Sequence, residues 1–419
     1  MSLILRGGKI IDGTGSPART GDVLIVDDRI AEVGTVSSGS DSRVIDVSGM
    51  TVVPGLIDCH VHITLGDTRV EPRSWTGFST FMTEQEAGFL SETSSAAREV
   101  AQGYHNGRET LRAGFTTVRD VGVGTGYSDI VLREAVANGF MTGPRILACG
   151  GGIAMTGGHG WDLGVVEADG VEALRALTRK QLKAGADLIK IFASRAGLSG
   201  EEPGGPEFTI EEIRVICDEA RQRGKHTAAH AVGTEGIRRA VLAGVDTVEH
   251  GCFLDEECAT LMAERGTVLV STLHPYDRQA ELCTKIGYPP YAATRSREIM
   301  DVYPERIRLA LEHGVRVVLG SDSGIPQLTP HGENAREIWL FAELVGASAV
   351  DAIHRATGAA ATAIHAGTDL GTIAPGKRAD IAVFAADLEA DLKRIMDRDA
   401  VRHVIRNGRL LIEQGQFTA

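Results

Sequence analysis

One repeated pattern constrains the fold of this chain more than any other feature. Six times, a helix-like segment ends in a glycine that is followed directly by a short apolar segment of strand-like composition. These glycines are Gly114, Gly185, Gly224, Gly244, Gly266 and Gly314. Glycine is favoured just past the last helical turn because it adopts a left-handed backbone conformation at little cost. The alternation of helices and strands predicts a parallel sheet covered by helices.

Eight apolar segments have the length and composition of strands. They span residues 56–63, 115–120, 145–149, 187–192, 226–230, 246–250, 268–272 and 316–322. Helix-like segments lie between them, among them residues 171–184, 210–223, 235–243, 255–265, 297–313 and 348–361. Eight successive strand and helix units make a closed (β/α)8 TIM barrel, in the α/β class, the natural architecture.

The sequence pattern differs at the two ends of the chain, where short β-like runs are separated by turn residues. Asn407-Gly408 between two apolar runs is a strong hairpin signal. We therefore expect residues 1–55 and 370–419 to meet in one small β-sandwich domain. Residues 56–369 are expected to form the barrel, which accommodates most of the 419 residues.

Charge and hydropathy exclude several classes of partner. The formal net charge of -13 argues against a nucleic-acid partner, because binding to phosphates needs clustered basic residues. No segment approaches the roughly 20 apolar residues that cross a bilayer. The N-terminal residues lead directly into a predicted strand and turn, so we expect neither a signal peptide nor a membrane partner.

The six cysteines are scattered without the close spacing of a disulfide framework or a Cys-based metal site. This distribution predicts a reduced, cytoplasmic protein. Cys59 precedes a histidine near the end of the first predicted strand. We interpret it as a small buried apolar residue rather than as a nucleophile.

Residues that can bind metals cluster near the ends of the predicted strands. They are His60 and His62 on the first strand, Lys190 on the fourth, His230 on the fifth, His250 on the sixth and Asp322 on the eighth. Active sites of such barrels lie at the carboxyl ends of the strands. Side chains two residues apart share a face of a strand, so His60 and His62 can bind one ion.

Each of these residues also has an ordinary structural alternative. Lys190 interrupts an apolar strand, where a buried ammonium is costly unless it is paired or chemically changed. A snorkelling side chain or a salt bridge would explain it equally. His230 and His250 could be buried core histidines, and Asp322 could cap a helix. Their shared location near strand ends favours a metal site.

The ordered motifs resemble the amidohydrolase superfamily over nearly the whole chain. The motifs are Val53-Pro-Gly-Leu-Ile-Asp-Cys-His-Val-His, Gly114-Phe-Thr-Thr-Val-Arg-Asp, Lys190, Ala229-His230-Ala231, Val248-Glu-His250-Gly and Gly320-Ser-Asp322. The resemblance implies that His60, His62 and Asp322 bind one divalent metal, and that His230 and His250 bind a second. It also implies that Lys190, carboxylated by carbon dioxide, bridges the two together with a hydroxide. Imidazole and carboxylate ligands suit zinc.

The same resemblance implies a mechanism of amide hydrolysis. The two metals would lower the pKa of the bridging water and polarise the scissile carbonyl. Asp322 would then take the proton and deliver it to the leaving amine. No nucleophilic side chain is needed.

Three further motifs are similar to the imidazolonepropionase-like branch that includes Xaa-Pro dipeptidases. They are Met155-Thr-Gly-Gly-His159-Gly, Thr272-Leu-His-Pro-Tyr276-Asp and Gly287-Tyr-Pro-Pro. The implied substrates are Xaa-Pro or related dipeptides and N-acyl amino acids. His159 is expected to act at the active site by contacting the substrate carbonyl or carboxylate, and its alternative is a structural hydrogen bond in a loop. Arg195 either pairs with the substrate carboxylate or forms a surface salt bridge.

One position departs from the dipeptidase pattern. The dipeptidases carry a tyrosine after the His-Ala of strand five, where this chain has Val232. Tyr276 is the candidate that would compensate for this loss. Hydrolysis of another amide, a carbamate, a urea or a cyclic amide therefore stays open as an alternative.

The metal site itself admits two different interpretations. A mononuclear relative would use the histidine pair, one further histidine and the aspartate, but the retained Lys190 argues against it. A non-catalytic barrel would be expected to have lost ligands, whereas all six are present. The expected partner is a small-molecule substrate, and a homo-oligomer is left open.

Overall fold

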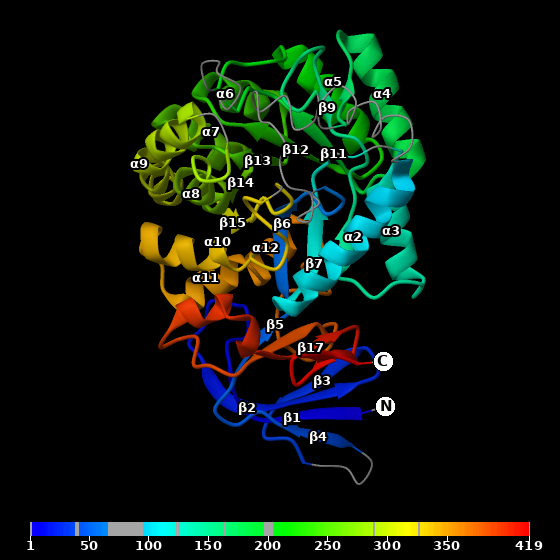
Figure 1. The fold of residues 1–419 in the computed structure, drawn as a ribbon, viewed down its shortest axis with the longest axis vertical. Coiled ribbons are helices and arrows are strands. Elements are labelled where there is room, and N and C mark those ends of the chain that lie inside the picture. Colours follow the sequence, from blue (N-terminus) through cyan, green and yellow to red (C-terminus); the bar gives the residue numbers. More distant parts are fainter. Residues whose placement is uncertain are drawn as a thin grey trace.

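A barrel and a β-sheet lie at opposite ends of the long axis of the molecule (Figure 1). The computed structural model describes residues 2–37, 42–65, 95–122, 124, 126–161, 164–196, 204–287, 290–325 and 327–418. Both chain termini lie at the end formed by the sheet (Figure 1). No helix within these residues is both long and apolar enough to span a membrane.

Eight parallel strands build the barrel, and they match the eight predicted strands in order. They are β6 (Leu56–Val61), β7 (Phe115–Asp120), β8 (Arg145–Leu147), β11 (Leu188–Phe192), β12 (His226–Ala231), β13 (Thr247–His250), β14 (Val268–Ser271) and β15 (Val317–Leu319). Strands β6 to β8 form one hydrogen-bonded sheet and β11 to β15 belong to another. The short strands β9 (Ile153–Ala154) and β10 (Val166–Glu167) extend the second sheet beside β11.

Backbone hydrogen bonds join the two sheets into a ring. The N–H of Asp322 donates to the carbonyl of His60 at 2.8 Å, which links the end of β15 to β6. On the other side, the N–H of Asp187 donates to the carbonyl of Ala148 at 2.7 Å and links β11 to β8. The predicted TIM-barrel architecture is therefore confirmed, with the carboxyl ends of all eight strands at the same end of the barrel.

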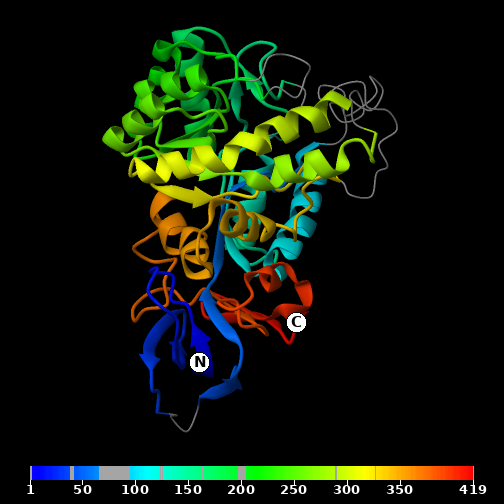
Figure 2. The same cartoon turned by 90° about the vertical axis from the view of Figure 1, so that its left-hand side faces the viewer.

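Helices surround the barrel strands (Figures 1 and 2). They are α2 (Ser95–Arg112), α3 (Ser128–Ala137), α4 (Val171–Ala184), α5 (Ile210–Arg221), α6 (Thr234–Ala243), α7 (Glu256–Arg265), α8 (Leu273–Leu282), α9 (Pro290–Glu312), α10 (Arg336–Leu340), α11 (Ala349–Arg355) and α12 (Gly358–Ala363). Short turns of other helix types are η2 (Phe341–Val345), η3 (Leu392–Met396) and η4 (Arg398–Ala400). All six glycines of the repeated pattern have positive φ angles, as predicted for residues that follow a helix.

The helix predicted over residues 348–361 is interrupted, and this part of the prediction was wrong. Helix α11 ends at Arg355 and α12 begins at Gly358. At the break, the hydroxyl of Thr357 donates to the carbonyl of Ile353 at 2.6 Å. A Cβ atom on Gly358 would lie 2.2 Å from the carbonyl oxygen of Gly13. The N-terminal segment thus packs against the break so closely that only glycine fits.

The two ends of the chain meet in one nine-stranded sheet. Its strands are β1 (Ser2–Ile10), β2 (Arg19–Val26), β3 (Arg29–Gly34), β4 (Arg43–Asp46), β5 (Thr51–Pro54), β16 (Ile381–Phe384), β17 (Val401–Arg406), β18 (Arg409–Glu413) and β19 (Gln416–Phe417). The N- and C-terminal halves join where β5 pairs antiparallel with β16. The predicted hairpin turn at Asn407-Gly408 is confirmed, with φ angles of 50° and 71°. The sandwich arrangement and the domain bounds stay predictions.

A partly buried ion pair connects the barrel to this sheet. Arg145 at the start of β8 donates to Asp380 Oδ2 at 2.6 Å and to Asn407 Oδ1 at 2.6 Å. The other carboxylate oxygen of Asp380 accepts the N–H of Asn407 at 2.7 Å. Asp380 thus holds the hairpin turn and the barrel strand together.

We expect Asp380→Ala to lower the free energy of unfolding by about 1–3 kcal/mol, because it leaves the donors of Arg145 and Asn407 without their acceptor. Asp380→Asn keeps the shape and one acceptor and should lose less. Thermal and urea denaturation of the two variants measure the difference. Equal stability of Asp380→Ala and the wild type would show that this contact does not hold the two parts together.

Candidate metal centre

The six predicted ligands line one pocket at the carboxyl ends of the barrel strands. The pocket encloses about 580 Å³, including its open mouth. Its walls are His60, His62, Leu65, His159, Lys190, Phe192, Ala196, His230, His250, Pro275, Tyr276, Gln279, Asp322 and Ile325. The alternation of side chains along each strand explains part of this placement. Lys190 and Phe192 share one face of β11, and His60 near the end of β6 points to the same side as His62, which directly follows that strand.

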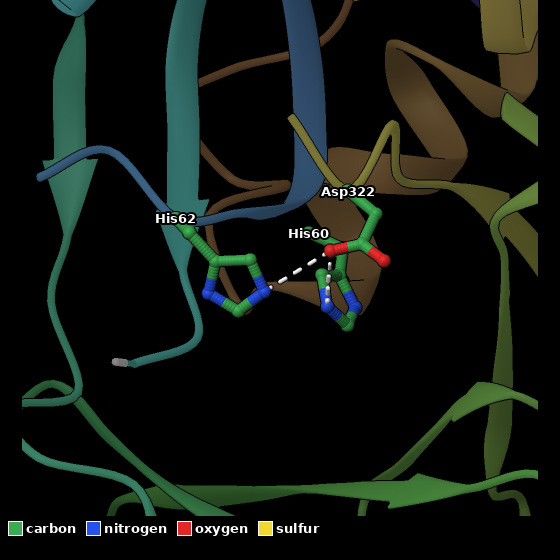
Figure 3. A group of neighbouring side chains, drawn as sticks. All are labelled: His60, His62 and Asp322. Atoms are coloured by element: carbon green, nitrogen blue, oxygen red, sulfur yellow. Dashed lines mark ion pairs between the residues drawn. The ribbon is translucent and has the colours of Figure 1, made fainter. Parts of the chain in front are cut away.

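His60, His62 and Asp322 form the tightest group (Figure 3). One oxygen of the Asp322 carboxylate, Oδ1, lies 3.0 Å from Nε2 of His62 and 3.5 Å from Nε2 of His60. Each of the three residues offers one atom that can bind a metal, and these three atoms lie within 4.8 Å of one another. This spacing suits three ligands of one metal ion.

The outer nitrogens of three histidines are already bonded to the protein. Nδ1 of His60 donates to Glu249 Oε2 at 2.8 Å, and Nδ1 of His62 donates to the carbonyl of Gly122 at 2.6 Å. Nδ1 of His250 shares a hydrogen bond with the hydroxyl of Thr272 at 2.7 Å. Bonds of this kind fix the ring and leave Nε2 as the free ligand atom, as is usual for histidines that bind metals.

Two buried nitrogen atoms of the pocket lack any hydrogen-bond partner within the described residues. They are Nζ of Lys190 and Nε2 of His230. Burial lowers the pKa of Lys190 to about 8 and lowers the pKa of His230 well below its usual value. Unpaired polar atoms in a protein interior are costly. A bound group that engages both atoms would remove this cost, so the residues fit a metal centre.

The backbone is strained at two of the predicted ligands. His250 has a φ angle of 72° and Asp322 a φ angle of 52°, in a region that side-chain-bearing residues adopt at a cost of about 1–3 kcal/mol. Consecutive strand residues normally point to opposite faces, yet Glu249 and His250 both reach His60. The left-handed conformation of His250 allows its ring to turn toward the pocket.

The electrostatic balance of the pocket favours an ionised aspartate, and its effect on the imidazoles differs between His60 and His62. Burial opposes the charge on Asp322, but His60 and His62 outweigh it and hold the pKa of the carboxyl well below its usual range. Burial, helped by the charge on Lys190, lowers the pKa of His60 to about 4. At His62, the hydrogen bond and the charge of Asp322 outweigh burial and raise the pKa. An anionic carboxylate and a neutral imidazole are the protonation states in which these side chains bind metals.

The predicted substrate residues have different positions. His159 lines the pocket, and its ring stacks on His230 with centroids 4.5 Å apart. Tyr276 also lines the pocket, where it hydrogen-bonds to the thiol of Cys252. Arg195 is exposed and is not among the lining residues, so its contact with substrate stays a prediction. Of the motif Gly287-Tyr-Pro-Pro, Tyr288 and Pro289 lie outside the described residues.

Other residues of the site were not predicted from the sequence. Gln279 lines the pocket one helical turn after Tyr276, and its Oε1 accepts a hydrogen bond from Ser296 at 2.9 Å. The spacing of three residues in a helix was the available signal. Glu249 contacts His60 from a position next to His250, but its partner Arg119 is 130 residues away in the sequence. Local sequence carries no signal for that pairing.

Cys59 has no role in this chemistry. It is buried and unpaired, and burial raises the pKa of its thiol to about 12. A thiol with so high a pKa is not a nucleophile at neutral pH. The other five cysteines are also buried and unpaired.

Known proteins resemble this chain over almost its entire length. A model of the amidohydrolase family matches residues 51–411. An ochratoxinase from Aspergillus niger is 28% identical over 446 aligned residues, which cover 97% of this chain and 86% of that protein.

Two solved structures are similar in both fold and sequence. A prolidase in complex with N-methylphosphonate-L-proline has a TM-score of 0.86 and 30% identity, covering 99% of this chain and 100% of that one. A Xaa-Pro dipeptidase with methionine bound in its active site has a TM-score of 0.84 and 31% identity, covering 98% and 99%.

Proposed function

This chain belongs to the amidohydrolase family, and we propose that it is a metal-dependent hydrolase that cleaves Xaa-Pro or related dipeptides or N-acyl amino acids. The family match confirms the resemblance predicted from the motifs, and the prolidase structures confirm the branch. One observation carries the proposal: six potential ligands converge on a single pocket, and two of them present buried polar atoms that have no hydrogen-bond partner among the described residues.

A pair of divalent metal ions fits the donors of this pocket. His60, His62 and Asp322 would hold one ion, and His230 and His250 would hold the other. Lys190, carboxylated by carbon dioxide, would bridge them and become an anion, which resolves the cost of burying its amine. The ligand set suits zinc. Bound metals would polarise the scissile carbonyl and lower the pKa of the attacking water.

The chain's own residues would position the substrate and move the proton. The carboxylate of Asp322 would accept a proton from the attacking water and deliver it to the nitrogen of the leaving group. The ring of His159, stacked on His230, would donate a hydrogen bond to the substrate carbonyl or carboxylate. The apolar walls formed by Phe192, Pro275 and Ile325 suit a proline ring or another apolar residue.

A second candidate is the hydrolysis of another amide, a carbamate, a urea or a cyclic amide. Two observations favour it over a dipeptide. Val232 stands where dipeptidases carry tyrosine and does not line the pocket, and the hydroxyl of Tyr276 interacts with the thiol of Cys252. Val232 therefore supplies no contact to a substrate carboxylate in the described part of the pocket, which leaves substrates without a carboxylate as a candidate.

The two candidates can be separated by assaying the protein, supplied with zinc and bicarbonate, against a substrate panel. The panel would hold Xaa-Pro dipeptides, other dipeptides, N-acyl amino acids, and carbamates, ureas and cyclic amides without a carboxylate. We expect turnover only of substrates with a carboxylate, two zinc ions per chain by elemental analysis, and loss of both activity and zinc after treatment with a chelator. Turnover only of substrates without a carboxylate would favour the second candidate. Protein that binds no zinc and cleaves nothing would contradict both.

A further inference from the structure

A buried ion pair lies beneath the predicted metal ligands. Arg119 on β7 donates from one terminal nitrogen to Glu249 Oε1 on β13 at 2.7 Å, and both side chains are 0% exposed. Strand β7 pairs with β6 and β8, whereas β13 pairs with β12 and β14. The ion pair therefore crosses the interior of the barrel rather than linking neighbouring strands.

The hydrogen bonds of this pair lead to one predicted ligand. Arg119 also donates to the carbonyl of Cys59 at 2.6 Å and to the hydroxyl of Thr247 at 3.1 Å. Its contacts hold one oxygen of the Glu249 carboxylate. The other oxygen, Oε2, accepts the Nδ1 proton of His60 at 2.8 Å. A fixed carboxylate thus determines the orientation of the His60 ring.

Stability alone does not explain a charged pair in this position. Removing two ionic groups from water costs several kcal/mol for each group, and apolar residues of similar size are often equally stable or better. Barrel interiors are usually filled by branched apolar side chains. The pair therefore needs a functional explanation, and its contact with His60 provides one.

We propose that Arg119 and Glu249 are positioning residues that keep the proton of His60 on Nδ1 and point Nε2 toward Asp322 and the pocket. This inference rests on the proposed function, because it assigns the free Nε2 to a metal ion. A carboxylate partner also makes the imidazole a stronger ligand. The described partner of the outer nitrogen of His250, a proposed ligand of the other ion, is a neutral hydroxyl. The ion held by His60 should therefore be the more tightly bound of the two.

The test compares zinc binding by the whole protein and its variants, measured by titration calorimetry and by elemental analysis after dialysis against graded chelator. In Glu249→Gln, the charge is lost, and only one of the two sides that face Arg119 and His60 keeps an acceptor oxygen. We expect the affinity for one zinc ion per chain to fall about 10- to 100-fold, and the affinity for the other to stay unchanged. A loss of fold would weaken both ions together.

Two further variants separate positioning from stability. Arg119→Gln combined with Glu249→Gln removes both charges, so we expect the thermal stability of the zinc-free protein to recover while the one zinc ion stays weakly bound. Thr227→Val is the matched control, because it removes a partly buried hydrogen bond to Asp246 at the opposite end of the barrel. It should lower the unfolding midpoint without changing zinc affinity.

Each contrary outcome has a distinct meaning. Wild-type affinity for both ions in Glu249→Gln would overturn the inference and leave the proposed function standing. Recovery of zinc affinity together with stability in the double variant would also overturn it, because the role would then be structural. Failure of the wild type to bind zinc would overturn the proposed function and the inference with it.

Discussion

Lys190→Met is expected to abolish hydrolysis and, at the same time, to stabilise the metal-free protein. Methionine has nearly the length and shape of lysine but no amine. It cannot be carboxylated, so the proposed bridge between the two metals is lost. Metal stabilisation of transition-state charge contributes several kcal/mol, which corresponds to at least about a 10³-fold loss of kcat/KM.

The gain in stability has a separate cause. Nζ of Lys190 is buried without a hydrogen-bond partner in the described part of the chain, and leaving such a group unsatisfied costs about 1–3 kcal/mol. Methionine removes this cost while it fills the same space. The unfolding midpoint of Lys190→Met, measured with chelator present, should therefore exceed that of the wild type.

The control for Lys190→Met is the same substitution outside the pocket. Lys225 contacts Asp187 at 3.6 Å at the other end of the barrel strands, and it is partly exposed. Lys225→Met should keep wild-type activity and zinc content. If Lys190→Met retained activity, Lys190 would not be part of the metal centre. If it were less stable than the wild type without metal, the buried amine would have a partner of its own.

Asp322→Asn is expected to lower kcat by about 10²- to 10⁴-fold, the usual contribution of a general acid–base group. The pKa of Asp322 is held well below its usual range, so the carboxylate is ionised throughout the neutral range. Asparagine has the same shape but cannot take up a proton. It also adopts positive φ angles more readily than most residues, so the strained backbone at this position is retained.

Zinc content and steady-state kinetics of Asp322→Asn distinguish two effects. Loss of the proton acceptor lowers kcat with little change in KM, whereas loss of a ligand lowers the zinc content. Asp351→Asn on helix α11 is a matched control, because Asp351 pairs only with Arg355 on the same helix among the contacts described. An Asp322→Asn variant with full zinc content and wild-type kcat would exclude Asp322 as the proton carrier.

Most of the barrel could be predicted from the sequence because its signals are local. Each strand is an apolar run, and the repeated glycines mark the turns that follow the helices. All eight strands and the positive φ angles of the six glycines are confirmed. The helix over residues 348–361 was predicted wrongly because Gly13, distant in the sequence, packs against its middle.

The location of the candidate site could be predicted for a different reason. In a closed parallel barrel, the carboxyl ends of all strands converge on one face, so strand position alone brings distant residues together. This geometry places residues as far apart as His60 and Asp322 in one pocket. Strand position does not predict where residues of the connecting loops lie. Arg195, three residues beyond β11, is exposed and does not line the pocket.

The sequence by itself determined the order of the strands, the barrel and the group of residues that share its carboxyl face. Only the tertiary structure decided that Arg119 pairs with Glu249 across the barrel, that His250 turns toward the pocket, and which nitrogen of His60, His62 and His250 is bonded to the protein. The physical reason is that periodicity encodes the face on which a side chain lies. Hydrogen bonds between strands that are not neighbours depend on distances across the barrel, which are set only when the ring of strands closes.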